Sequence, residues 1–424
     1  MEKRISVFPS SVMVDQRVQI SVTGLDAGSK VTIRSFMLAE KYRFEAHGHF
    51  IADQNGQIRL THSHSVGGSY KGVQPMGLFS CMQPSPGQRS GIRYSKKDIT
   101  TPLIVTLSLH NEHIDTKMLQ TNESIASTQL RRWYLADHCE RIVVRNGRIR
   151  GSLIKPKGRG HFPGVIDMFG HAGGLLDFRA ALLASHGFAV LALAFYNYDD
   201  LPTDINEISV EYCDEAVQWF SNEPYVIKGG IGVCGVSFGG TIGLQMASRF
   251  PDKISASVVI SSPIAVIEPP IKYKGKPMPY LDFDRGKSKL LPDGSLRAKG
   301  CYRDVREVSE DTKIKIENIR KMLFIVGEDD EDFDASLHAS EAVKRLHANA
   351  RNSDDYEVLY YPGTGHLIEP PYRPVTTMSY HRIADTLIKW GGNIEDQAKA
   401  QEDAWLQVLG FLHKHIGVNA SSKL

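Results

Sequence analysis

The stretch Ile-Gly-Val-Cys-Gly-Val-Ser-Phe-Gly at residues 231–239 decides the fold of this chain. It contains an apolar run, 232–236, that is typical of a buried strand, and it leads into residues 238–250, which we expect to form a helix. A glycine stands two residues before and two residues after Ser237, so that strand and helix can approach without a Cβ clash. This pattern predicts a nucleophile elbow; the alternative is a small-residue turn with a capping serine. Ser237 is therefore the candidate nucleophile of an acyl-transfer reaction.

Apolar segments alternate with helical segments on both sides of this elbow. The predicted strands are 165–169, 188–195, 232–236, 256–260, 322–326 and 356–361, and the predicted helices are 175–185, 207–220, 238–250, 335–347 and 396–415. Continuous apolar strands that alternate with helices indicate a parallel sheet covered on both faces. Residues 264–315, rich in Lys, Pro, Gly and Asp, interrupt the alternation, and we expect them to leave the sheet and cap or line a site.

The chain before residue 136 has a different pattern, with short alternating runs separated by Gly, Asp, Asn and Ser. The predicted strands there are 18–22, 31–34, 44–51, 58–60 and 103–109, and a hairpin with Asn-Gly in its turn is expected at 143–150. Strands of this spacing favour an antiparallel sandwich. We therefore predict an all-β, immunoglobulin-like sandwich domain at 1–135 and an α/β-hydrolase catalytic domain at 136–424.

Charge and cysteine content exclude several classes of protein. The formal net charge of +2 gives no reason to expect binding of nucleic acid or of an anionic membrane. The five cysteines are scattered without a CxxC pair, so neither a disulfide framework nor a zinc site is expected. The pairs His47/His49 and His62/His64 lack a third ligand, which favours solvated side chains over a metal site. No apolar run reaches the length of a membrane span, and we expect no cofactor.

Two strand ends supply partners for the serine. A serine hydroxyl needs a base to remove its proton, and in this fold the chain order is Ser, acid, His. His366 follows the predicted strand 356–361 in a Gly-rich loop, and Gly-Glu-Asp-Asp follows strand 322–326. Carboxyl ends of parallel strands meet at one edge of a sheet, where Ser237 must also lie. We predict His366 as the base and Asp330 as the acid that orients it, with Asp329 as the main competitor.

The oxyanion that forms during acyl transfer needs two backbone N–H donors. We expect one from Phe238, directly after the nucleophile, and the other from Gly173 in the loop 170–174 that follows strand 165–169. His171 in the same loop is a second candidate base, but it precedes the nucleophile in the chain. Cys234 is a second candidate nucleophile, although a thiol inside a strand is more typical of a buried, inert residue.

Several longer stretches resemble one known family over nearly the whole chain. They are Gly-Ser-Tyr-Lys-Gly-Val-Gln-Pro-Met-Gly-Leu at 68–78, Ile-Asp-Met-Phe-Gly at 166–170, Ala-Phe-Tyr-Asn-Tyr at 194–198, Asp-Leu-Pro at 200–202, Tyr-Pro-Gly-Thr-Gly-His at 361–366, Ile-Glu-Pro-Pro-Tyr at 368–372 and Trp-Gly-Gly at 390–392. The chain is similar to the type I acyl-CoA thioesterases, which share a family with the bile acid-CoA:amino acid N-acyltransferases.

The resemblance implies an N-terminal sandwich, a C-terminal α/β-hydrolase domain and a triad of Ser237, Asp330 and His366. It implies hydrolysis of an acyl-CoA substrate to free fatty acid and CoA. The amino-acid-conjugating branch has cysteine at the position of Ser237. A serine acyl-enzyme is an oxygen ester and is more suited to attack by water than a cysteine thioester, so this residue favours hydrolysis, with N-acyl transfer to an amino acid as the alternative.

The C-terminal tripeptide Ser422-Lys423-Leu424 matches a peroxisomal import signal. It predicts an import receptor as a partner and a peroxisomal location, against the alternative of a tail without function. Three lysines in the interrupting segment, Lys272, Lys274 and Lys276, are candidates for contact with CoA phosphates, although a solvated basic loop is the simpler interpretation.

Overall fold

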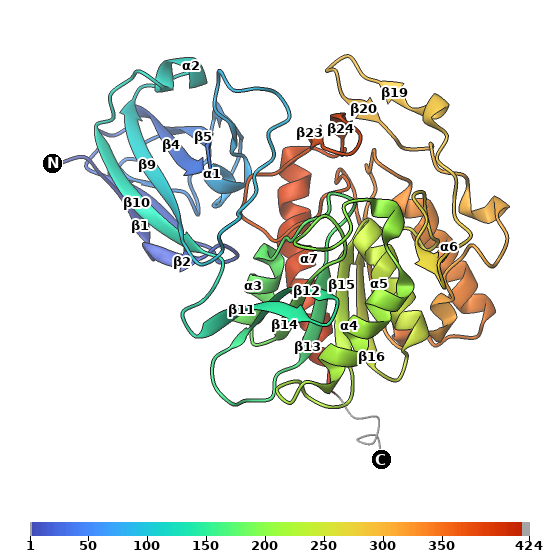
Figure 1. Cartoon of the computed structure of the whole chain (residues 1–424). Coiled ribbons are helices and arrows are strands. Elements are labelled where there is room, and N and C mark those ends of the chain that lie inside the picture. Colours follow the sequence, from blue (N-terminus) through green and yellow to red (C-terminus); the bar gives the residue numbers. More distant parts are fainter. Residues whose placement is uncertain (1, 418–424) are drawn as a thin grey trace. The chain divides into compact units, whose positions relative to one another are not determined.

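The structure is a computed structural model that describes residues 2–417, so the import tripeptide 422–424 lies outside the described residues. The chain divides into two compact units, which we describe separately. Within the described residues, the first comprises 2–134 with 370–376, and the second comprises 135–369 with 377–417 (Figure 1). The sequence patterns do not indicate that residues 370–376 belong to the first unit. Within the first unit it is held by a hydrogen bond from the backbone N–H of Val375 to the carbonyl of Ser80, at 3.0 Å.

Two β-sheets build the first unit, as the sandwich prediction requires. The smaller sheet has the order β1 (Arg4–Phe8), β3 (Gln19–Thr23), β6 (Ile58–Arg59). The larger has the order β2 (Ser11–Met13), β10 (Ala126–Trp133), β9 (Leu103–Asn111), β4 (Lys30–Ala39), β5 (Tyr42–Ile51), β7 (Gly67–Gly68), with β8 (Gln83–Pro84) also paired to β5. The only helices described here are the one-turn segments α1 (Gly77–Ser80) and α2 (Thr116–Leu119). Strand β10 carries three charged or amide residues, Gln129, Arg131 and Arg132, around the single apolar Leu130, which explains why the sequence did not reveal it.

The second unit is built on one eight-stranded sheet. Its order is β11 (Cys139–Asn146), β12 (Ile149–Pro156), β14 (Ala189–Ala194), β13 (Gly164–Met168), β15 (Ile231–Val236), β16 (Ile254–Ile260), β21 (Met322–Gly327), β22 (Tyr356–Tyr361). β11 and β12 form the predicted hairpin, and every pair from β14 to β22 is parallel. β13, β14, β15, β16 and β21 are buried along their whole length. This explains why β14, β15 and β21 are continuous apolar runs, whereas β13 also buries Asp167 and β16 also buries Ser255 and Ser257. The predicted α/β-hydrolase architecture is confirmed.

Helices cover both faces of this sheet (Figure 1). Successive residues of a strand point to opposite faces, and β15 shows the consequence. A Cβ on Gly232 would meet Leu412 and Ile416 at the end of α7 (Ile394–His415), whereas Val233 lies beside Gly243 of α5 (Phe238–Arg249). The remaining helices are α3 (Phe178–Ser185), α4 (Val210–Asn222) and α6 (Ala335–Ala348). Helix α3 begins three residues later than predicted, because residues 175–177 belong to the loop that follows β13.

The segment predicted to leave the sheet does so. It contains the hairpin β17 (Lys272–Tyr273) and β18 (Lys276–Pro277), the short strands β19 (Lys289–Leu290) and β20 (Leu296–Arg297), and the single 3₁₀ turns η2 (Arg285–Lys287) and η3 (Val305–Glu307). A further 3₁₀ turn, η4 (Ile316–Asn318), follows the segment. Two further 3₁₀ turns, η1 (Ile205–Glu207) and η5 (Ser353–Asp355), precede α4 and β22. β20 pairs with β24 (Thr386–Lys389), which forms a hairpin with β23 (Met378–His381), so the excursion is tied to residues that follow His366 in the chain.

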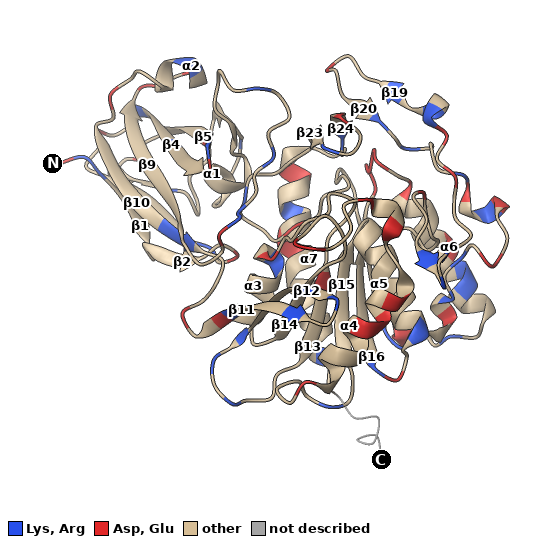
Figure 2. Ribbon diagram, viewed as in Figure 1, with Lys and Arg blue, Asp and Glu red and all other residues tan. Residues whose placement is uncertain are grey.

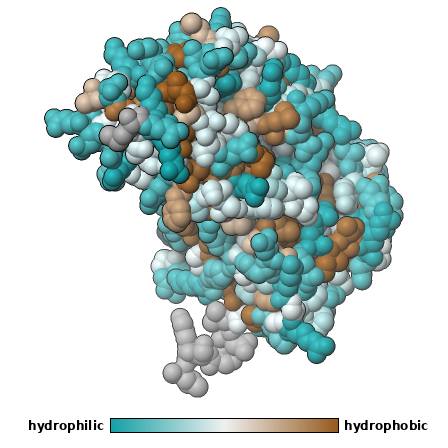
Figure 3. Space-filling view, turned by 90° about the vertical axis from the view of Figure 1, so that its left-hand side faces the viewer, coloured by the Kyte–Doolittle hydropathy of each residue, from teal (hydrophilic) through white to brown (hydrophobic). Residues whose placement is uncertain are grey.

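Surface charge agrees with the near-neutral composition. Figure 2 shows acidic and basic residues interspersed along the ribbon, and on the face drawn in Figure 3 the hydrophobic side chains form small spots among hydrophilic ones. No helix in the described part of the chain is long and apolar enough to cross a membrane.

Candidate active site

Ser237 stands at the junction of β15 and α5 in a strained backbone conformation. Its φ of 55° and ψ of −129° lie outside the regions that non-glycine residues usually adopt. Its N–H donates to the carbonyl of Ile260 at 2.9 Å, which ties the elbow to the end of the neighbouring strand β16. Strain of this kind persists only where the surroundings enforce it, and it is concentrated at functional sites. The geometry is that of the predicted nucleophile elbow.

The two flanking glycines explain why this turn can be so tight. A Cβ on Gly235 would lie 2.4 Å from the carbonyl oxygen of Gly239, and a Cβ on Gly239 would lie 2.4 Å from that of Phe169. Both contacts are with backbone atoms that have no freedom to move away. Helix α5 therefore approaches the ends of β13 and β15 so closely that only glycine fits at positions 235 and 239, which explains the sequence Gly-x-Ser-x-Gly.

His366 and Asp330 lie together at the carboxyl ends of β22 and β21. The Nδ1 of His366 is 2.7 Å from Oδ2 of Asp330, and both side chains are only 1% exposed. Oδ1 of Asp330 accepts hydrogen bonds from the backbone N–H groups of Asp332 at 2.9 Å and Phe333 at 3.1 Å. The carboxylate is thus oriented from both sides, and it fixes the tautomer in which Nδ1 of His366 carries the proton.

Asp329, the competing acid, is placed differently. It is exposed, and its backbone N–H donates to the carbonyl of Thr364 at 2.9 Å. Asp330, by contrast, is fully buried, and it forms a β-bridge with Gly391. The structure therefore brings Asp330 to the histidine, because the turn after Gly327 leaves Glu328 and Asp329 exposed and directs Asp330 inward.

Trp390 encloses the histidine on a further side. The backbone N–H of His366 donates to the carbonyl of Trp390 at 2.8 Å, and the two rings are nearly parallel with centroids 5.6 Å apart. The indole N–H donates to Ser379 Oγ at 2.8 Å, so the large ring is held in place. Sequence reasoning noted the Trp-Gly-Gly stretch only as part of a resemblance, since nothing local indicates that it returns to the histidine loop.

The loop that follows β13 lies against the elbow, and it does so through Gly170. A Cβ on Gly170 would be 3.2 Å from Cβ and 3.4 Å from Oγ of Ser237. Gly173 has a φ of 63°, and a Cβ there would lie 2.6 Å from the Tyr196 ring. Tyr196 holds this loop, because its hydroxyl donates to the carbonyl of His171 and its carbonyl accepts from the N–H of Gly174 at 3.0 Å. Phe238, the other predicted donor, is the first residue of α5, where backbone N–H groups have no acceptor within the helix.

Neither of the alternative reactive residues has the chemistry that its role would require. Burial lowers the pKa of His171 to about 3, and its ring stacks on Phe238 with centroids 4.4 Å apart. A histidine that is so reluctant to accept a proton is a poor general base at neutral pH. Burial raises the pKa of Cys234 to about 12, so its thiol stays protonated and is a poor nucleophile.

Other candidate ligands do not gather into a site. Lys272 forms an ion pair with Glu207 at 2.6 Å, whereas Lys276 is exposed on β18. His47 and His49 pack against each other with ring centroids 5.2 Å apart. Within residues 2–417, no group of three or more His, Cys, Asp or Glu side chains is arranged to hold a metal ion.

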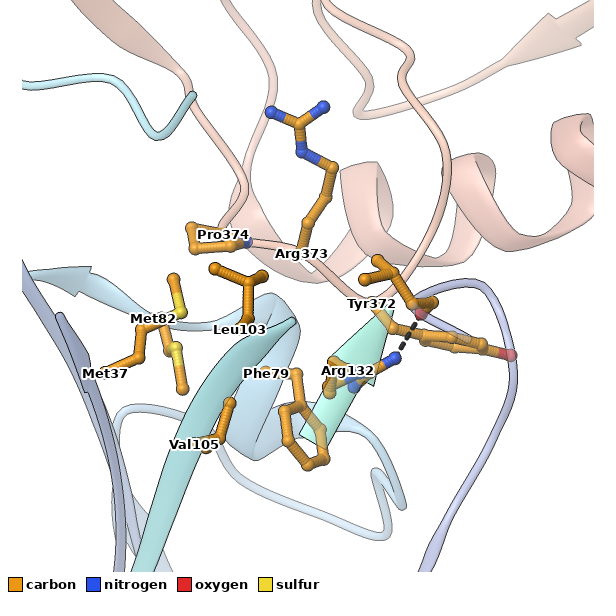
Figure 4. A pocket seen from close by; sticks show the side chains of 10 residues that line it. Met37, Phe79, Met82, Leu103, Val105, Arg132, Tyr372, Arg373 and Pro374 are labelled. Carbon is orange, nitrogen blue, oxygen red and sulfur yellow. Dashed lines mark hydrogen bonds between the residues drawn. The ribbon is translucent and has the colours of Figure 1, made fainter. Parts of the chain in front are cut away.

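A small apolar cavity lies within the first unit (Figure 4). Its lining includes Met37, Met82 and Phe79, with the fully buried Arg132 stacked 4.5 Å over the Phe79 ring. It contains no nucleophile with an adjacent base, so it is not a candidate for the acyl-transfer chemistry.

Comparison with known proteins identifies the family of this chain. The family described as Acyl-CoA thioester hydrolase/BAAT N-terminal region matches residues 15–146, and the one described as BAAT / Acyl-CoA thioester hydrolase C terminal matches residues 208–418. The chain belongs to the acyl-CoA thioester hydrolase/BAAT family. The resemblance inferred from its motifs is confirmed, and the matches include the elbow and both strand-end partners.

The relatives within the acyl-CoA thioester hydrolase/BAAT family include proteins named as thioesterases and proteins named as N-acyltransferases. Human acyl-coenzyme A thioesterase 1 is 38% identical over 95% of this chain and 94% of its own length. Mouse peroxisomal succinyl-coenzyme A thioesterase is 39% identical over 98% of each chain, and mouse bile acid-CoA:amino acid N-acyltransferase is 36% identical over 99% of this chain and 100% of its own. Among solved structures, an esterase of Pyrobaculum calidifontis is 17% identical over 66% of this chain and 86% of that chain, with a TM-score of 0.40.

Proposed function

We propose that this protein is an acyl-CoA thioesterase that hydrolyses fatty acyl-CoA to free fatty acid and CoA through an acyl-enzyme on Ser237. The observation that carries the proposal is the buried pair of His366 and Asp330 at 2.7 Å, at the sheet edge where the strained Ser237 ends β15. Membership of the acyl-CoA thioester hydrolase/BAAT family supports the thioester substrate. No step of this chemistry requires a cofactor.

In the first half-reaction Ser237 Oγ attacks the thioester carbonyl while Nε2 of His366 accepts its proton. Asp330 stabilises the imidazolium that forms and keeps the ring in place. The N–H of Phe238 and an N–H of the loop 170–174 hold the oxyanion. The C–S bond then breaks, His366 returns the proton to the departing thiolate, and CoA leaves with the acyl group bound to Ser237.

In the second half-reaction the acyl-enzyme reacts with water. An oxygen ester on Ser237 is less reactive toward amines than a thioester on cysteine would be, which favours hydrolysis over conjugation. Two mouse relatives are named as N-acyltransferases, at 36% identity each, so transfer to an amino acid is the alternative outcome to test.

The test is an assay of the purified protein with palmitoyl-CoA, with and without glycine or taurine. We expect free palmitate and CoA in equal amounts, whether or not the amine is present, and no turnover by Ser237→Ala. An N-acyl amino acid as the main product would instead identify a transferase. Thioester turnover that survives Ser237→Ala would refute the mechanism.

We further propose that residues 136–424, apart from the segment 370–376 that belongs to the first unit, form the catalytic domain and that residues 1–135 form a separate sandwich domain. We also propose that the import receptor carries the protein into peroxisomes by binding Ser422-Lys423-Leu424. A mouse relative at 39% identity is named peroxisomal, which supports the location. Deleting Leu424 from a fluorescent fusion tagged at the N-terminus should leave the protein in the cytosol. Import that continues without Leu424 would contradict the proposal.

A further inference from the structure

A second carboxylate faces the catalytic side of His366. Asp332 lies two residues after Asp330, and its Oδ2 is 3.5 Å from Nε2 of His366. Asp330 occupies the other ring nitrogen, Nδ1, at 2.7 Å. The imidazole therefore has an acidic side chain beside each of its two nitrogens. Nε2 is the nitrogen that must exchange protons with Ser237 and with the attacking water.

The backbone of Asp332 is fixed while its carboxylate remains available. The Asp332 N–H donates to Oδ1 of Asp330 at 2.9 Å, which ties its position to that of the acid. Within residues 2–417, the Asp332 carboxylate makes no hydrogen bond to the protein, and its one ion-pair partner is His366. The side chain is 26% exposed, so it lies between the protein interior and solvent. A carboxylate that solvent reaches beside the reacting nitrogen is placed to hold a water molecule there.

The proton affinity of this carboxylate is also unusual. Burial raises the pKa of Asp332 to about 6, and the neighbouring charge of Asp330 acts in the same direction, while His366 opposes them. Tyr302 and Cys301 also lie within electrostatic range of the carboxylate. A group of this kind is ionised at neutral pH, yet it accepts a proton from a carboxylic acid more readily than an ordinary aspartate does.

We propose that Asp332 is a further catalytic residue of the hydrolytic half-reaction, in which it holds the attacking water against His366. The proposal rests on the acyl-enzyme mechanism of the proposed function. One hydrogen of the water points to Nε2 of the neutral His366, and the other points to the carboxylate of Asp332. Acceptors that lie 3.5 Å apart are close enough for a single water to reach both.

The protons and bonds of this step balance. The water oxygen bonds to the acyl carbon as one proton passes to Nε2, and the bond from that carbon to Ser237 Oγ then breaks. His366 returns its proton to Oγ, which regenerates the free serine. The second proton of the water leaves the nascent carboxylic acid for Asp332 and passes from there to solvent. The product departs as a carboxylate, and no other reactant is needed.

The test separates the two half-reactions. Asp332→Asn and the unchanged enzyme are mixed rapidly with palmitoyl-CoA, and released CoA is followed with a thiol reagent. The protein's five cysteines are buried, so the early signal reports CoA. We expect acylation at nearly the normal rate, a burst of about one CoA per site, and then a turnover lowered about 10- to 100-fold, the value of one hydrogen bond to a charged group. Intact mass should show palmitate bound to the variant.

The matched control is Asp329→Asn, which makes the same chemical change on an exposed aspartate of the same loop. It should leave both rates unchanged. Hydroxylamine, a nucleophile that needs little help from a base, should restore acyl-enzyme turnover in Asp332→Asn while forming the hydroxamate. A variant with damaged folding would show neither a full burst nor this rescue.

Two results would overturn the proposal. One is an Asp332→Asn variant whose turnover and burst equal those of the unchanged enzyme. The other is equal loss of acylation and deacylation, which would mean that Asp332 supports His366 in general and does not position water. Failure of the proposed function would look different, because the unchanged enzyme itself would then release no CoA from palmitoyl-CoA.

Discussion

Replacing Asp330 by asparagine tests the assignment of the acid at a single pair of atoms. The asparagine side chain has the same shape, and its oxygen can still accept from the N–H groups of Asp332 and Phe333, which lie 2.9 and 3.1 Å from Oδ1 of Asp330. The amide –NH₂ then faces Nδ1 of His366, in the place of the Oδ2 that accepts from Nδ1 at 2.7 Å in the unchanged protein. Because two donors cannot face each other, Nδ1 must become an acceptor and the proton must move to Nε2. The histidine then cannot take the proton of Ser237.

The expected loss is about 10⁴-fold in kcat, the cost of holding a triad histidine in the wrong tautomer. This corresponds to about 5.4 kcal/mol in the barrier, at about 1.36 kcal/mol for each factor of ten. The cost should fall on kcat more than on KM, since the acid does not touch the substrate. Stability should change little, because both backbone donors keep their acceptor.

The assay compares Asp330→Asn with Asp329→Asn using palmitoyl-CoA, with thermal unfolding as a check on folding. Asp329 is exposed, so its variant should keep full activity. If Asp329→Asn lost 10³-fold or more while Asp330→Asn stayed within tenfold of the unchanged enzyme, the assignment of the acid would be wrong.

Three further predictions follow from the same geometry. Ser237→Cys should make a thioester acyl-enzyme and raise the share of conjugate formed with glycine or taurine. The ratio of conjugate to free fatty acid measures this share, and an unchanged ratio would show that the nucleophile does not select the acceptor. Gly235→Ala should destabilise the protein by about 3 kcal/mol or more, because the new Cβ would lie 2.4 Å from a backbone oxygen, whereas Gly243→Ala, with its nearest contact at 3.5 Å, should be neutral or stabilising in thermal unfolding. Asp332→Asn should be more stable than the unchanged protein above pH 6 by up to about 3 kcal/mol, with the gain vanishing toward pH 4. The folded-state pKa of Asp332, about 6, lies above the ordinary value of 3.8, so between these pH values the folded protein binds a proton that the unfolded chain does not. The unchanged protein therefore loses stability as the pH rises from 3.8 to 6. A stability gain of Asp332→Asn that persists at pH 4 would contradict this prediction.

The sequence was informative wherever chemistry depends on local pattern. The strand 232–236, the elbow at Ser237 and the strand ends before Asp330 and His366 were all readable, because each requires particular residue types at neighbouring positions. Steric exclusion explains the glycines: the 2.4 Å approach to backbone at Gly235 and Gly239 leaves no alternative residue. Parallel strands place their carboxyl ends at one edge, so even the meeting of the strand-end partners could be expected.

Only the tertiary structure could choose between residues that are equivalent in sequence. Asp329, Asp330 and Asp332 stand in one acidic run, yet one is exposed, one is buried against Nδ1 of His366 and one faces Nε2. In the loop 170–174, a Cβ on Gly170 would lie 3.2 Å from Cβ of Ser237, whereas a Cβ on Gly173 would meet the ring of Tyr196 at 2.6 Å.

What the sequence by itself determined was the kind of chemistry and the fold that carries it, since both follow from residues close together in the chain. What the tertiary structure decided was which neighbour acts, and from which side. Those choices depend on contacts between segments such as 330–332, 366 and 390–391, whose approach is set by the packing of the whole sheet, and no local pattern encodes it.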